Sequence, residues 1–177
     1  MVFILEEIAR IESDRRIQHD LNETRVHVQA SEFFKDTDTF RVIDSMLENY
    51  VNYAQHYVWD GSIISILGVF TDAFLNAGMW GNQNTPKKKI TVQLKYGILG
   101  SVIYIADEGE GFDYLTEIGK VQRGEKHTCH HNGGGLRKFH ESNLHIAYHG
   151  KGNVISIATP VFTQEEVNRF LERSRRT

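Results

Sequence analysis

Apolar residues recur at helical spacing in four segments of the chain. Their intervals of three and four residues predict amphipathic helices that each bury one face. The segments are residues 2–21, 38–54, 62–78 and 163–175. Asp38 is suited to cap the second helix, and a capping box formed by Thr163 and Glu166 opens the last one.

Five shorter segments are predicted to be β-strands. They are residues 24–28, 89–96, 101–106, 144–148 and 154–158. Gly97 and Gly100 bound a hairpin turn between the second and third strands, and residues 149–152 join the last two. The stretch 107–135 is rich in glycine and histidine and is predicted to be a loop, with no helix directly after Phe112.

Runs of adjacent strands between helices favour an α+β fold. We expect a two-layer sandwich, with helices packed on one face of a mixed or antiparallel sheet. Residues 1–22 are interpreted as an N-terminal amphipathic helix, and residues 23–177 as one domain that ends in the helix 163–175. The isoleucine stripe of the first helix must be buried, either against its own domain or against a second copy of the chain.

Composition narrows the class of protein. The 177 residues are 40% hydrophobic and 24% charged, and their net charge of −3 argues against a general nucleic-acid binder. No apolar stretch approaches the roughly 20 residues of a membrane span. The single cysteine, Cys129, excludes an internal disulfide and favours a reducing compartment. Without a recognisable signal sequence, we expect the cytoplasm.

Asp72 and Asn76 are the first candidate site residues. They stand four positions apart in a predicted helix and therefore share one of its faces. Their oxygens are suited to a hard cation, and the carboxylate is suited to polarise a hydroxyl group. The competing interpretation is an exposed polar pair.

A glycine box, Asp107-Glu108-Gly109-Glu110-Gly111-Phe112, directly follows a predicted strand. Glycines at alternate positions allow the backbone to approach a ligand closely. A carboxylate at the end of a strand can accept a hydrogen bond from an amino group such as that of adenine. The competing interpretation is an acidic turn.

A second glycine run, Asn132-Gly133-Gly134-Gly135-Leu136, precedes a short helical segment. Free backbone N–H groups at the start of a helix suit phosphate, and Arg137 and Lys138 add positive charge. The competing interpretation is a flexible loop.

The order and separation of these three segments resemble the N, G1 and G2 boxes of the Bergerat-fold ATPases. This superfamily contains DNA gyrase, heat-shock chaperones, histidine kinases and mismatch-repair ATPases. The chain looks most like the anti-sigma-factor serine/threonine kinases within it, over roughly residues 24–160. The matching N-box positions are Asp72, Asn76-Ala77 and Gly81-Asn82, and the G1 box is matched at every defined position.

The resemblance implies an ATP site with Mg²⁺. Asp107 would bind the adenine amino group, and Asn76 would coordinate the magnesium ion. The other residues that the resemblance places at the nucleotide are Gly109, Gly111, Phe112, Asn82, Gly133, Gly134, Gly135 and Leu136. The segment between the G1 and G2 boxes, about residues 113–132, would form a mobile lid.

Two positions depart from the family pattern. Asp72 stands where the general base is a glutamate, and the missing methylene retracts the carboxylate by about 1.5 Å. A misplacement near 1 Å can cost about a hundredfold in rate. Trp80 stands where a histidine is common.

The resemblance and its departures leave several functions open. The first is a serine/threonine kinase that phosphorylates an antagonist in a partner-switching pathway, with a sigma factor or antagonist as partner and with homodimers. The alternatives are an ATP-dependent protein-binding module with little or no phosphotransfer and a stand-alone histidine-kinase-type ATPase domain.

Histidines at two places invite other interpretations. His127, Cys129, His130 and His131 are metal-ligand types, but adjacent side chains splay apart, and a polar lid is the better interpretation of this cluster. His19 weakly resembles a phosphoacceptor, although the two-helix hairpin of histidine kinases is missing around it.

Overall fold

The computed structural model describes residues 22–29, 45–52, 62–97, 100–125, 139, 142 and 144–158. The predicted helices 2–21 and 163–175 lie outside these residues. Of the predicted helix 38–54, the described part, residues 45–52, is helical. Within the described ranges, no helix has the length and apolar character needed to cross a membrane.

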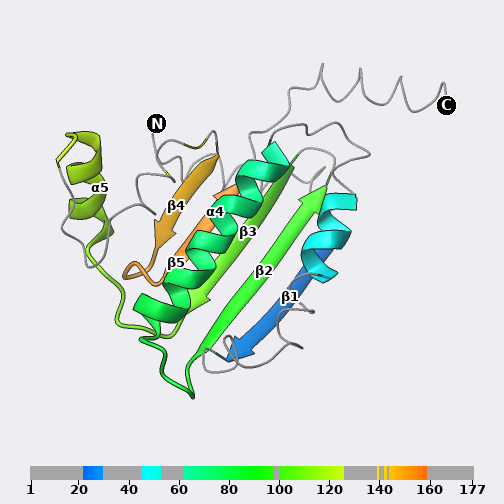
Figure 1. The fold of residues 1–177 in the computed structure, drawn as a ribbon, viewed down its shortest axis with the longest axis horizontal. Helices are drawn as coiled ribbons and strands as arrows, with labels where there is room; N and C mark the ends of the chain where they lie inside the picture. The colour runs from blue at the N-terminus through cyan, green and yellow to red at the C-terminus, as the bar shows by residue number, and fades with distance from the viewer. Residues whose placement is uncertain are drawn as a thin grey trace.

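Five strands form one sheet, and all five were predicted from the sequence within about two residues at each end. They are β1 (Asn22–Gln29), β2 (Lys89–Gly97), β3 (Gly100–Asp107), β4 (His145–His149) and β5 (Val154–Ala158). Their order is β1-β2-β3-β5-β4, and each neighbouring pair is antiparallel. The sheet of the described residues is therefore antiparallel rather than mixed, and β3 is its central strand (Figure 1).

The register of the sheet follows the apolar pattern of its strands. Val92 pairs with Ile105, and Ile105 pairs with Ile155, so these three buried side chains line one face. Because side chains alternate between faces, a slip of one residue would turn all of them away from the core. Burial of this face therefore fixes the register, which places Asp107 opposite Ile90 at the end of β3.

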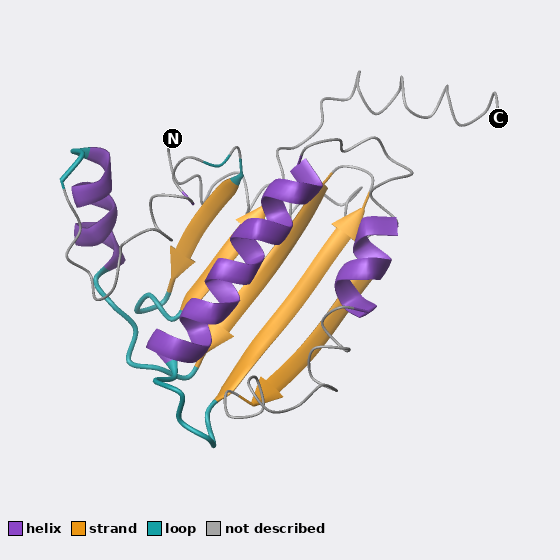
Figure 2. Cartoon of the chain, viewed as in Figure 1, coloured by secondary structure: helices purple, strands orange, loops and turns teal. Residues whose placement is uncertain are grey.

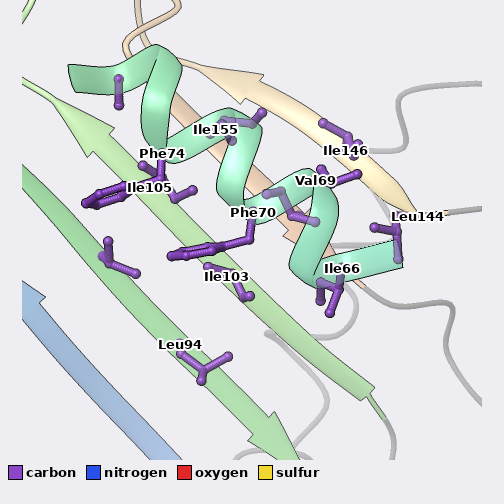
Figure 3. Close-up of a cluster of buried hydrophobic side chains, with 14 of the residues drawn as sticks. Ile66, Val69, Phe70, Phe74, Leu94, Ile103, Ile105, Leu144, Ile146 and Ile155 are labelled. Carbon is purple, nitrogen blue, oxygen red and sulfur yellow. The ribbon is translucent and has the colours of Figure 1, made fainter. Parts of the chain in front are cut away.

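Helix α4 (Ser62–Asn76) covers this apolar face and runs along the strands over β3 and β5 (Figure 1). Phe70, Phe74 and Ala77, which were expected to face inward, are buried, whereas Leu67 is only partly buried. Ile66 and Val69, which were not singled out from the sequence, are buried as well. The rings of Phe70 and Phe74 stack 5.8 Å apart, and Figure 3 shows both directed from α4 toward the sheet. Burial of each such ring stabilises the fold by about 1.5–3 kcal/mol.

The helix of residues 45–52 lies on the same face of the sheet as α4 (Figure 2). Its Tyr50 is fully buried, and the phenol oxygen lies 2.7 Å from Ser101 Oγ on β3. Burial raises the pKa of Tyr50 to about 12, although the hydrogen bond with Ser101 opposes that shift. These contacts make a helix layer on a sheet layer, which confirms the α+β two-layer arrangement.

A further helix, α5 (Tyr114–Gln122), shows that the predicted loop over residues 107–135 was wrong in part. Asp113 caps this helix, because its carboxylate accepts hydrogen bonds from Thr116 N at 3.1 Å and Thr116 Oγ1 at 2.6 Å. An ion pair of 2.6 Å joins Glu117 to Lys120 one turn later. Figure 2 shows α5 apart from the helix layer, at the side of the sheet where β4 lies.

Candidate functional site

The end of α4 and the end of β3 meet at the predicted N and G1 boxes. After Asn76, the chain makes a π-helical turn, η1 (Ala77–Gly81), closed by a 2.8 Å hydrogen bond from Asn82 N to Ala77 O. Such wide turns are rare and often lie at functional sites. Here the turn places Gly81 directly against Asp107.

Gly81 and Gly109 enclose the Asp107 carboxylate. A Cβ atom added to Gly81 would lie 2.5 Å from Asp107 Oδ2 and 2.6 Å from Oδ1, so the Gly81 backbone covers the flat face of this carboxylate. A Cβ on Gly109 would collide with the carbonyl of Gly81. Both positions therefore require glycine for the close approach that the structure shows.

One oxygen of the Asp107 carboxylate is occupied within the chain. Oδ1 accepts a 2.8 Å hydrogen bond from the backbone N–H of Gly109. Among the described residues, this is the hydrogen bond that the carboxylate receives, and Oδ2 is left to accept one from a ligand. Burial raises the pKa of Asp107 above its ordinary value, while the Gly109 N–H and the charges of Lys88 and Lys151 oppose this shift.

Two asparagines hold the backbone on either side of this carboxylate. Asn82, fully buried, donates from Nδ2 to Lys89 O and accepts at Oδ1 from Glu108 N, both at 2.9 Å. Asn153 donates from Nδ2 to Asp107 O at 3.0 Å, and its own carbonyl accepts from Asp107 N at 3.0 Å. Asn153 was not among the site residues predicted from the sequence, because it lies in a hairpin turn far along the chain from the glycine box.

The second half of the glycine box locks against the turn between β4 and β5. Gly111 and Gly152 have φ values of +77° and +92°, which side chains rarely tolerate. Phe112 N donates to Lys151 O at 2.9 Å. A Cβ on Gly111 would collide with the carbonyl of Lys151, and one on Gly152 with that of Phe112. The two loops therefore interlock at two glycines.

Phe112, the last residue of the glycine box, belongs to an aromatic cluster with Tyr114 and Tyr148. Its ring lies 5.1 Å from that of Tyr148 in an edge-to-face arrangement, and Tyr114 stacks on Tyr148 at 5.7 Å. Phe112 keeps 39% of its surface exposed. Burial raises the pKa of the Tyr148 phenol. This cluster ties the glycine box to β4 and to the first residue of α5.

Asp72 and Asn76 lie one turn apart near the end of α4, and both are half-buried. Their carboxylate and amide oxygens match the ligands that Mg²⁺ takes in proteins. Trp80, in η1, keeps 45% of its surface exposed.

The second glycine run lies outside the described residues, and so does the histidine and cysteine cluster. The positions concerned are Gly133, Gly134, Gly135 and Leu136, with His127, Cys129, His130 and His131. In the part of the chain that the structure describes, no three His, Cys, Asp or Glu side chains gather into a metal-binding group.

No protein-family model matches the chain, and a search of curated proteins finds no significant match.

Proposed function

We propose that the chain is an ATP-binding domain of the Bergerat type and acts as a serine/threonine protein kinase in an anti-sigma-factor or partner-switching pathway. The observation that carries this proposal is the Asp107 carboxylate, which is covered on one face by Gly81 and bonded at one oxygen to Gly109. Gly81 and Asp107, which the resemblance assigns to the N box and the G1 box, are in contact there although they are distant in sequence, and this contact supports the proposal.

Asp107 would recognise adenine through its Oδ2 atom. Oδ1 already accepts a hydrogen bond from the Gly109 N–H. The 6-amino group of adenine would donate the second hydrogen bond to this carboxylate, at Oδ2. Gly109 and Gly111 would shape the adenine pocket indirectly, because the absence of their side chains leaves room for the carbonyls of Gly81 and Lys151. The partly exposed ring of Phe112 offers the base an apolar contact.

Asn76 would hold Mg²⁺ through its amide oxygen, half-buried at the end of α4. When bound, the ion would neutralise part of the negative charge of the phosphates. By the resemblance, residues 133–136 would bind the phosphates through backbone N–H groups.

Asp72 decides between the kinase and a second candidate function. Its half-buried carboxylate, four residues before Asn76, would orient the acceptor hydroxyl and take its proton. Aspartate is shorter than the family's glutamate, and a misplacement of the carboxylate by about 1 Å would lower the rate of phosphotransfer by about a hundredfold. The aspartate thereby favours a module that binds ATP and a protein partner with little phosphotransfer.

Labelled ATP separates these functions. The protein is incubated with [γ-³²P]ATP, Mg²⁺ and candidate antagonist proteins, and label on a partner serine or threonine is measured beside ATP affinity. For a kinase, Asp72→Asn removes the transfer and keeps the affinity, while Asp72→Glu keeps or raises the transfer. Tight ATP binding with no label in any of the three proteins would support the binding module instead.

The partner and the oligomeric state belong to the same proposal. The resemblance implies a protein partner, a sigma factor or its antagonist, and a homodimer. Light scattering of the purified chain, with and without ATP and Mg²⁺, tests the dimer directly. A monomer at all protein concentrations would remove that part of the proposal and leave the nucleotide site unaffected.

A further inference from the structure

Asn82 is the buried polar side chain that connects the N box to the G1 box. Its exposure is 0%, and its amide spans from the carbonyl of Lys89, at the start of β2, to the N–H of Glu108, just after β3. Both hydrogen bonds measure 2.9 Å, and both partners are backbone atoms. These bonds direct the amide of Asn82 to the protein and not toward a bound molecule.

The peptide between Asp107 and Glu108 is held at both of its polar ends. Asn82 Oδ1 accepts its N–H, and Asn153 Nδ2 donates to its carbonyl at 3.0 Å. Glu108 adds a third link, because its Oε2 atom accepts the N–H of Lys89 at 2.9 Å. This peptide carries the Cα atom from which the Asp107 side chain projects, so its orientation sets the direction of the carboxylate.

Asn82 is also covalently joined to the residue that covers the carboxylate. Gly81 lies over the face of Asp107, and Asn82 N anchors the end of η1 on Ala77 O at 2.8 Å. A shift of Asn82 would therefore move the Gly81 cover and the Asp107–Glu108 peptide together. Because buried polar groups left without partners are costly, the arrangement is held strongly.

We propose that Asn82 is a positioning residue that gives the site its specificity for a 6-amino purine. The inference rests on the proposed ATP-binding function and assigns Asn82 an indirect role, through Asp107 and Gly81, in place of contact with the nucleotide. Asn153 serves the same purpose from the other side of the peptide. Loss of either amide removes selectivity for the 6-amino group more than it removes nucleotide affinity as a whole.

The test compares ATP with purine riboside 5′-triphosphate, which lacks only the 6-amino group. Isothermal titration calorimetry of the full chain, with Mg²⁺ present, gives the affinity for each nucleotide. The wild-type protein should prefer ATP by about tenfold or more, as expected for one hydrogen bond to a charged acceptor. In Asn82→Ala, the preference should fall to about threefold or less, while the affinity for the analogue changes little.

A matched control separates positioning from general loss of stability. Tyr50→Phe also removes a buried hydrogen bond, the 2.7 Å contact with Ser101, but at the start of β3, the opposite end of that strand from Asp107. It should keep the full preference for ATP. Asn153→Ala, which removes a part-buried side chain and leaves the backbone bond from Asp107 N in place, should lower the preference in the same direction as Asn82→Ala. This variant decides the matter if Asn82→Ala does not fold.

The outcomes distinguish this inference from the function on which it rests. If the wild-type chain binds neither nucleotide, the proposed ATP site itself is wrong. If the wild type prefers ATP and the folded variants keep that preference, the positioning role is wrong and the ATP site stands. Equal losses for both nucleotides in Asn82→Ala would likewise overturn the positioning role.

Discussion

Gly111→Ala tests the interlock between the glycine box and the turn of the β4–β5 hairpin. The φ angle of Gly111 is +77°, and the added Cβ would meet the backbone carbonyl of Lys151. The left-handed conformation costs an alanine about 1–2 kcal/mol. Forcing an extra methyl group into packed structure costs about 1–3 kcal/mol more. We therefore expect a loss of about 2–5 kcal/mol in the free energy of unfolding.

Gly124→Ala is the matched control. Its φ angle is +69°, close to that of Gly111, but nothing lies within 4 Å of its added Cβ. This variant should lose only the conformational part, about 1–2 kcal/mol. Urea denaturation of both variants, followed by circular dichroism, measures the difference. Equal losses in the two variants would show that the loops at Gly111 and Lys151 do not pack as the structure has them.

Three further predictions concern single groups. Burial raises the pKa of Asp107 in the folded state above that in the unfolded state, so the ionised carboxylate destabilises the nucleotide-free protein. This destabilisation is lost as the pH falls through the folded-state pKa to the unfolded-state pKa, which is about 4. Asp107→Asn should therefore melt at a higher temperature than the wild type at pH 7 without nucleotide, with the advantage vanishing in acid; a lower melting temperature at pH 7 would contradict this. Tyr50→Phe should lose about 0.5–1.5 kcal/mol in urea denaturation through its bond with Ser101, and an unchanged midpoint would contradict the burial of that bond. Asp113→Ala should speed amide hydrogen exchange in α5, because Thr116 loses both of its bonds to the cap, and unchanged exchange would exclude the cap.

The sandwich was predictable because its elements carry strong periodic signals. The strands 89–96 and 101–106 were predicted to form a hairpin, and the structure pairs them with Val92 opposite Ile105. The apolar spacing of residues 62–78 predicted a helix that buries one face, and Phe70 and Phe74 are buried on that face of α4. These elements form because each buries one face, and a buried face leaves apolar residues at regular intervals in the sequence.

Helix α5 was missed although Tyr114, Ile118 and Val121 stand at helical spacing. The segment has only nine residues and lies in a stretch that was interpreted as a loop from its glycines and histidines, and the helix lies apart from the helix layer. What holds it is local: the Asp113 cap and the ion pair of Glu117 with Lys120. An aspartate followed by a glutamate in the first turn was the available signal.

The candidate site was predictable in part. Asp107, Gly81 and Gly109 were singled out from the sequence, and the structure brings all three into contact. Asn153 was out of reach, because its bond to Asp107 depends on how β5 pairs with β3, a long-range property of the sheet. The nucleotide role of these residues stays a prediction.

ATP binding by Asp107 is the central claim, and one calorimetric comparison tests it most directly. Wild-type protein and Asp107→Asn are titrated with ATP and Mg²⁺ at pH 7. The amide can still accept the Gly109 N–H at one atom, but it then presents an NH₂ group where the adenine amino group must be accepted. The wild type should bind ATP, and the folded variant should bind it at least about tenfold more weakly. No binding by the wild type, or equal affinity in both proteins, would contradict the account.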